Sequence, residues 1–100
     1  MSPQTLIDRV RIQAFCRKWK VAELSVFGSA LRQDFGPDSD VDILVSFAPD
    51  APWSLYDWGD MIQELEGIFG REVDLVEKSA VRNPFRRHHI LNNREIVYAT

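Results

Sequence analysis

A chain of 100 residues is long enough to bury one hydrophobic core but too short for separate catalytic and substrate-recognition domains. The formal net charge of −3 argues against a dedicated nucleic-acid or anionic-membrane surface, because such surfaces carry a concentrated basic stripe. A single cysteine cannot form an intramolecular disulfide, and no apolar run approaches the ~18 residues that a membrane-spanning helix needs. We therefore expect one soluble, cytoplasmic domain over residues 1–100, without a membrane segment and without direct nucleic-acid binding.

The predicted elements are short, and helices alternate with strands. The first is a helix that begins at Ser2–Pro3, because serine can cap a helix and proline fits its first turn, and that ends near Trp19. Its predicted apolar stripe is formed by Leu6, Ile7, Val10 and Ala14. Apolar runs and breaker residues then predict a strand at 22–27, a short helix at 29–33, a loop at 34–40, a strand at 41–47, a helix at 55–69 and a strand at 71–77.

Two more elements complete the chain. Ser54 and Asp57 have the spacing of a capping box at the start of the helix at 55–69, and Gly70 marks its end. A last helix is expected at 84–92, and the apolar tail at 95–99 is either strand or helix. This order of elements predicts an α/β (α+β) domain, in which helices pack on one face of a small mixed sheet.

Carboxylates occur at defined positions in two of the predicted strands. Asp40 and Asp42 flank Val41, and because side chains alternate along a strand, both point away from the apolar face of the strand at 41–47. The same alternation places Asp74 opposite the apolar face of its own strand. If the two strands are neighbours, the three carboxylates gather in one cluster, but the sequence alone does not establish that they are neighbours.

A cluster of this kind indicates a metal site. Three ionised carboxylates repel one another unless a cation lies between them, and Mg²⁺ or Mn²⁺ prefers such hard oxygen ligands. Two ions held roughly 4 Å apart are a known device for phosphoryl transfer. Gly28 and Ser29 follow the strand at 22–27, where glycine allows a phosphate to approach the backbone. Each feature alone is more often an ordinary turn, but their combination indicates a site for a nucleoside triphosphate.

The same residues carry a family resemblance. The stretch FGSALRQDFGPDSDVDILV, with the later VDLV, resembles the signature of the DNA polymerase β-type nucleotidyltransferase superfamily. The small size, Arg32, and the stretches GREVDLV and ILNNREIVYA are similar to the minimal nucleotidyltransferase (MNT) antitoxins of bacteria and archaea. The resemblance implies a single minimal nucleotidyltransferase domain. It also implies nucleotide binding by Gly28, Ser29 and Arg32, and catalysis and metal binding by Asp40, Asp42 and Asp74.

The resemblance further implies a partner and a reaction. MNT antitoxins of this size bind a HEPN-domain ribonuclease toxin and transfer AMP from ATP to a tyrosine hydroxyl of the toxin. By analogy, we expect a protein adenylyltransferase that uses ATP and two Mg²⁺ ions, with Mn²⁺ as a substitute, and that forms a hetero-oligomer with its toxin. A tightly bound partner would also supply the substrate recognition that a chain of this length lacks.

Two alternatives stay open from the sequence. The chain could neutralise a toxin by steric binding without catalysis, through exposed aromatic and basic residues at Trp53, Tyr56, Trp58 and 82–89, or it could transfer a nucleotide to a small molecule. The helical spacing of Trp58 favours a place in the core, and Trp53 is expected to pack against a loop. The adjacent residues His88 and His89 face different ways on a helix, which does not favour a metal site.

Overall fold

The computed structural model describes residues 8–28 and 40–100. In this part of the chain the elements follow one another as α1 (Arg9–Lys18), β1 (Val21–Phe27), β2 (Val41–Phe47), α2 (Leu55–Phe69), β3 (Val73–Glu77), the short 3₁₀ helix η3 (Lys78–Ala80), α3 (Pro84–Asn92) and β4 (Arg94–Ala99). The strands form one sheet in the order β3-β2-β1-β4. Strand β1 runs antiparallel to β2 and β4, whereas β2 and β3 run parallel. The predicted α+β class and the mixed sheet are confirmed.

Helix α1 buries a different face from the predicted one. Asp8 caps this helix by accepting a hydrogen bond from the Arg11 backbone N–H at 3.2 Å, so the helix begins later than predicted. Val10 is 78% exposed and Ala14 is also exposed, which makes the predicted stripe wrong at these positions. The buried side chains are Ile12, Phe15, Cys16 and Trp19. This set removes more apolar surface from water than the predicted one does, and it therefore determines which face packs inward.

The remaining residues of the predicted first helix are Ser2–Pro3, Leu6 and Ile7, which lie outside the described residues. Within α1, Cys16 is fully buried as a small packing residue, and burial raises the pKa of its thiol to about 12. The thiol therefore stays protonated at neutral pH.

Helix α2 has the predicted ends. The Ser54 side chain accepts a hydrogen bond from the Asp57 backbone N–H, and the Asp57 carboxylate accepts one from the Ser54 backbone N–H, which completes the capping box. The helix ends at Gly70, whose φ of 69° lies in the left-handed region that favours glycine. Met61, Leu65 and Phe69 are buried and turn toward the sheet, whereas Leu55, the first residue of the helix, is 88% exposed.

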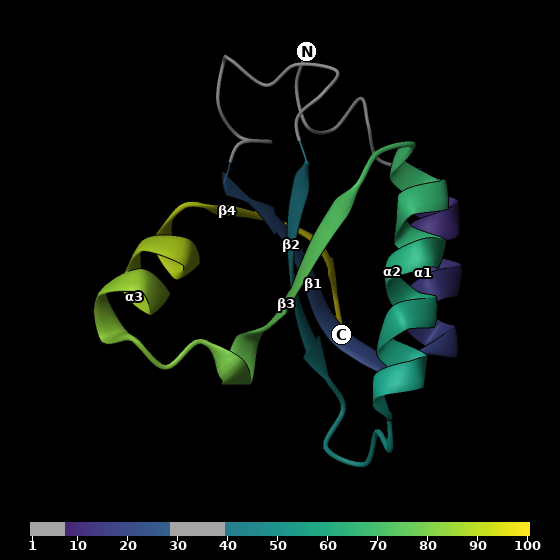
Figure 1. Cartoon of the computed structure of the whole chain (residues 1–100), viewed down its shortest axis with the longest axis horizontal. Coiled ribbons are helices and arrows are strands. Elements are labelled where there is room, and N and C mark those ends of the chain that lie inside the picture. Colours follow the sequence, from purple (N-terminus) through teal and green to yellow (C-terminus); the bar gives the residue numbers. More distant parts are fainter. Residues whose placement is uncertain (1–7, 29–39) are drawn as a thin grey trace.

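Two apolar layers lie on opposite faces of the sheet. The larger one packs α1 and α2 against β-strand residues such as Leu24, Ile43 and Val45. The smaller one joins Phe27 and Leu44 of the sheet to Val81 and Ile90 near α3. Figure 1 shows α1 and α2 on one side of the sheet and α3 on the other. The predicted one-sided packing therefore holds for α1 and α2, and α3 covers part of the second face.

The last two elements resolve a question that the sequence left open. Helix α3 spans Pro84–Asn92 as predicted, and the tail that follows is a strand, β4, because it pairs with β1 at the edge of the sheet. The short helix predicted at 29–33 and the loop up to residue 39 lie outside the described residues. Among the helices of residues 8–28 and 40–100, none has both the length and the apolar composition needed to cross a bilayer.

Candidate active site

Strand pairing brings two of the predicted carboxylates together. Asp42 of β2 and Asp74 of β3 are direct register partners in the parallel pair. Residues in matching register on neighbouring strands present their side chains to the same face, and the strands lie about 4.8 Å apart. Val41 and Ile43, on either side of Asp42, are fully buried toward α1 and α2, so the carboxylates lie on the opposite face. The sequence left open whether these strands are neighbours, and the structure shows that they are.

The two carboxylates differ in exposure. Asp42 is half-buried, whereas Asp74 is exposed between the buried Val73 and Leu75. The difference follows from the sheet order, because β2 lies inside the sheet and β3 forms its edge. An acceptor group can therefore approach Asp74 from solvent more easily than it can approach Asp42.

Gly28 lies directly against the Asp42 carboxylate. Its φ is 70°, and a Cβ atom added to Gly28 would lie 2.1 Å from Oδ2 of Asp42. The antiparallel pairing of Phe27 with Asp42 explains the contact, because it carries the chain past this carboxylate as β1 ends. No side chain larger than hydrogen fits here without displacing the carboxylate. The structure thus brings Gly28, Asp42 and Asp74 together, as the sequence predicts.

The remaining predicted site residues are placed only in part. Asp40 is exposed and precedes β2 by one residue, where the Val41 backbone N–H donates to the Glu72 carbonyl oxygen at 2.9 Å. This bond ties the start of β2 to the start of β3. Ser29 and Arg32, the predicted phosphate contacts, lie outside the described residues.

The donor set fits a hard cation, but the described residues do not form a complete metal cluster. Within 8–28 and 40–100, no three side chains from His, Cys, Asp and Glu come together in a group that could hold an ion. The pair of Asp42 and Asp74 offers carboxylate oxygens, which Mg²⁺ and Mn²⁺ bind in preference to softer donors. Metal binding by Asp40, Asp42 and Asp74 therefore stays a prediction.

A polar cluster that the sequence analysis missed lies on the same face of the sheet. Arg94 of β4 donates hydrogen bonds to the Glu23 carboxylate and to Ser25 Oγ, the latter at 3.3 Å, and Lys78 Nζ lies 3.6 Å from Glu23 Oε1. The hydrogen bond from Arg94 lowers the pKa of Glu23. The alternation of polar and apolar residues in β1 hints at this face, but the partner of Glu23 is distant in sequence and could not be inferred.

One residue of the basic segment at 82–89, Arg87, has a structural role. Arg87 donates hydrogen bonds from Nη1 to the carbonyl oxygens of Lys78, at 2.8 Å, and Val81, at 3.3 Å. Asn83 caps α3 by accepting from the backbone N–H groups of Phe85 and Arg86. These contacts fix the segment between β3 and α3, which covers the face on which Asp42 lies.

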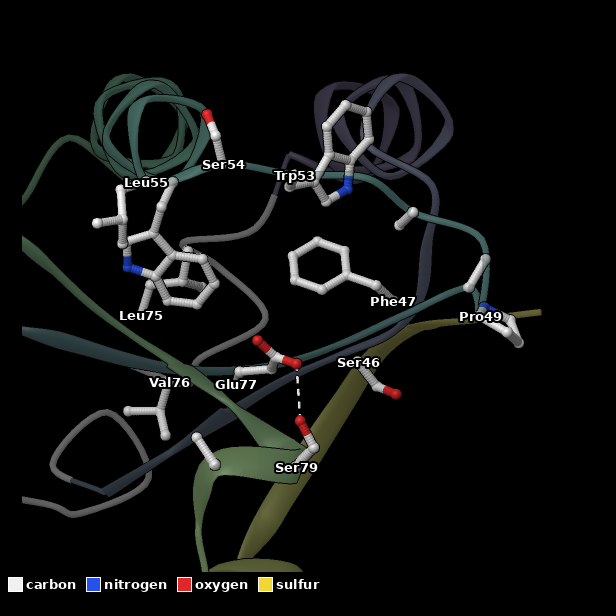
Figure 2. A pocket seen from close by; sticks show the side chains of 14 residues that line it. Ser46, Phe47, Pro49, Trp53, Ser54, Leu55, Leu75, Val76, Glu77 and Ser79 are labelled. Carbon is white, nitrogen blue, oxygen red and sulfur yellow. Dashed lines mark hydrogen bonds between the residues drawn. The ribbon is translucent and has the colours of Figure 1, made fainter.

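A groove of about 980 Å³ opens at the other end of the same two strands. Figure 2 shows Phe47 and Glu77, the last residues of β2 and β3, together with Trp53, at this groove. The loop from β2 to α2 and the first turn of α2 complete it. Asp42 and Asp74 lie near the amino ends of β2 and β3, so the groove is separate from the carboxylate site.

Comparison with known proteins agrees with this geometry. The model of the nucleotidyltransferase domain family matches residues 9–97. The protein adenylyltransferase MntA of Thermococcus cleftensis is 40% identical over 81 residues, which cover 81% of this chain and 77% of that protein. A minimal nucleotidyltransferase of known structure is 32% identical, with a TM-score of 0.70 over 94% of each chain.

Two solved toxin–antitoxin structures share the fold at lower identity. One, with AMP-PNP, has a TM-score of 0.72 at 22% identity and matches 94% of this chain and 75% of its own. The other is a tri-AMPylated Shewanella oneidensis HEPN toxin in complex with its MNT antitoxin, with a TM-score of 0.63 at 21% identity over 98% of this chain and 73% of that one. The family match and the 40% identical relative, together with the paired aspartates beside a glycine, confirm the resemblance found in the sequence. The chain therefore belongs to the nucleotidyltransferase domain family as a minimal nucleotidyltransferase, an enzyme of the nucleotidyl-transferring class.

Proposed function

We propose that this enzyme is an antitoxin that transfers AMP from ATP to a tyrosine hydroxyl of a HEPN-domain ribonuclease toxin, in an Mg²⁺-dependent reaction in the cytoplasm. The observation that carries the proposal is the register pairing of Asp42 with Asp74 beside Gly28. The relative named protein adenylyltransferase MntA and the solved toxin–antitoxin relatives support the acceptor class and the partner.

The roles proposed for Ser29 and Arg32 follow from the family resemblance, and those of the other site residues follow from the resemblance and from their positions. Gly28 lets the triphosphate approach the backbone, and the Ser29 hydroxyl and the Arg32 guanidinium contact phosphate oxygens. Asp40, Asp42 and Asp74 would hold two Mg²⁺ ions, or Mn²⁺ in their place, which neutralise phosphate charge when bound. The half-buried Asp42 orients the nucleotide, and the exposed Asp74 faces the acceptor.

The transfer is a displacement at phosphorus. The tyrosine oxygen forms a bond to the α-phosphorus of ATP, the bond from that phosphorus to the pyrophosphate oxygen breaks, and pyrophosphate leaves. Asp74 is placed to accept the hydroxyl proton, because its carboxylate is the one exposed to solvent in the described pair. Binding to the toxin supplies the acceptor at high effective concentration, so the enzyme needs no enclosed acceptor pocket.

The experiment uses the HEPN-domain toxin that the proposal expects as the partner of this protein. The purified pair is incubated with ATP and Mg²⁺, and the intact mass of the toxin is measured, followed by peptide mapping of the modified residue. We expect AMP-sized increments on a tyrosine with the wild-type enzyme and none with the Asp40→Asn, Asp42→Asn double variant. Increments that persist in the double variant, or that map to another residue type, contradict the proposal.

A second candidate function is favoured by the groove, which offers a binding surface remote from the carboxylates. In this alternative the protein neutralises its toxin by steric binding alone. The toxin's ribonuclease activity, measured in the presence of the double variant, separates the two. Full neutralisation without AMP transfer supports steric binding, whereas recovery of ribonuclease activity supports the enzymatic antitoxin.

A further inference from the structure

We propose that the groove at the carboxyl ends of β2 and β3 is the docking site for an apolar segment of the toxin that carries a lysine or arginine. This inference rests on the proposed function, because it takes the HEPN-domain toxin as the partner. It adds a surface that the catalytic residues do not include, at the opposite end of the strands that carry Asp42 and Asp74.

The walls of the groove are aromatic and held in place. Phe47 and Trp58 meet edge to face, with ring centroids 6.3 Å apart. Trp53 donates a hydrogen bond from Nε1 to the Trp19 carbonyl oxygen at 2.7 Å, which fixes its indole ring. Trp58 packs against the core, as the sequence predicts; Trp53, which was expected to pack against a loop, also packs against the core, and both line the groove. Aromatic side chains that are already fixed before binding are typical of the central residues of protein interfaces, because little entropy is lost when a partner covers them.

The rim of the groove carries an apolar side chain with no role in the core. Leu55 is the first residue of α2, it lines the groove, and it is 88% exposed. Its neighbour Tyr56 is 89% exposed. Leu55 thus extends the apolar lining of the groove to its rim, as in surfaces that a protein partner covers.

The negative charge in the groove favours a partner segment that carries a positive charge. Among the described residues that line it, Glu77 is the one with a charged side chain. Figure 2 shows the Glu77 carboxylate at the groove, where it accepts a hydrogen bond from Ser79 Oγ at 2.7 Å. A carboxylate has about four lone-pair positions and can accept further donors. A cation from the partner would pair with it in apolar surroundings, where charge-assisted hydrogen bonds are strong. The complementary segment is therefore apolar with one basic residue.

The size of the groove accommodates part of a protein partner. About 980 Å³ is enough for several side chains. Asp42 and Phe47 are five residues apart on β2, which corresponds to about 17 Å along the strand. Because the separation is odd, Phe47 and Asp42 point to opposite faces of the sheet, so a toxin domain that fills the groove must extend past the edge strand β3 to reach the carboxylates.

The test measures binding separately from catalysis. The dissociation constant of the complex with the purified toxin is determined without ATP for Leu55→Lys and Glu77→Gln. We expect each variant to weaken the complex by about tenfold, because the first removes an apolar contact and repels the basic segment while the second removes its counter-charge. Val10→Lys on α1 is the matched control, since it places the same charge at a residue 78% exposed outside the groove, and it should bind as wild type. Thermal melting of each variant confirms that the fold is retained.

The outcomes separate this inference from the proposed function. Wild-type affinity in both groove variants overturns the docking site, and so does the absence of any complex between the wild-type protein and the toxin. Self-association lost in Leu55→Lys, with the toxin complex unchanged, would assign the groove to a second copy of this chain and also overturn the proposal. If the groove variants weaken binding but the wild-type enzyme transfers no AMP, the docking site stands and the enzymatic function fails.

Discussion

At the scale of single residues, the contact between Gly28 and Asp42 links the left-handed conformation of the glycine to the position of a candidate metal-binding carboxylate. The sequence predicts phosphate binding at Gly28, and the structure adds that the glycine leaves room for the Asp42 carboxylate. Gly70 has nearly the same φ, 69° against 70°, but a Cβ atom there would meet nothing within 4 Å. Comparing alanine substitutions at the two glycines therefore separates the energetic cost of backbone strain from the effect of displacing the Asp42 carboxylate.

This pair gives a controlled prediction. Both Gly28→Ala and Gly70→Ala should lose about 1 kcal/mol of folding free energy or more, because alanine is strained in the left-handed region. Only Gly28→Ala should also lose AMP transfer, because its new methyl group displaces the Asp42 carboxylate. Thermal unfolding and the transfer rate are measured on both variants. Equal transfer rates for the two would show that the Gly28 contact does not position the carboxylate.

The ion pair between Glu23 and Arg94 predicts how stability depends on pH. The hydrogen bond from Arg94 holds the pKa of Glu23 below its ordinary value of 4.5, so the unfolded chain binds a proton more readily at this residue than the folded chain does. The stabilising contribution is fully present above about pH 4.5 and is lost as the pH falls through the lowered pKa.

Glu23→Gln tests this dependence. At neutral pH the variant should lose about 1–3 kcal/mol of unfolding free energy, because Arg94 keeps its position but loses a charged partner. The difference from wild type should shrink below pH 4.5. Urea unfolding across this range measures both effects, with Asp60→Asn on the exposed face of α2 as the control for charge. A difference that does not change with pH would contradict the assignment.

At the scale of elements, the start of α2 depends on a local capping box. Ser54→Ala removes the hydrogen bond to the Asp57 backbone N–H and should lower the unfolding free energy by about 1 kcal/mol. Ser54→Thr should stay within about 0.5 kcal/mol of wild type, because threonine keeps the hydroxyl that accepts from the Asp57 backbone N–H and donates to the Asp57 carboxylate. Chemical denaturation measures both variants. If they prove equally destabilised, the cap does not stabilise this helix.

The elements that could be predicted from the sequence are those with local signals. The capping residues of α2, its terminal Gly70 and Pro84 at the start of α3 depend only on neighbours in sequence, and their predicted positions are confirmed. The buried face of α1 and the strand at the end of the chain depend on what packs beside them. Ala14 has the right spacing for a core position, but Phe15 buries more surface, and the tail becomes β4 only because β1 offers a free edge.

At the scale of the whole molecule, the sequence predicts those parts of the candidate site that depend only on the alternation of side chains along a strand. The direction of Asp42 and Asp74 required only the two-residue period, and their proximity required the pairing of β2 with β3, which the structure supplies. The partner of Glu23 lies 71 residues away in Arg94, and the groove combines residues on either side of α2, so neither leaves a continuous pattern in the sequence. The two proposals thus place catalysis at one end of β2 and β3 and toxin docking at the other end.

The rate of AMP transfer within the preformed toxin complex tests the central claim most directly. Asp42→Asn and Asp74→Asn are compared with Asp60→Asn, which removes the same charge from an exposed position on α2. We predict that the first two reduce the single-turnover rate by about a hundredfold or more, because several kcal/mol of transition-state stabilisation depends on these carboxylates. Asp60→Asn should react as wild type. Transfer at the wild-type rate by Asp42→Asn or Asp74→Asn would contradict the assignment of this site as the catalytic centre.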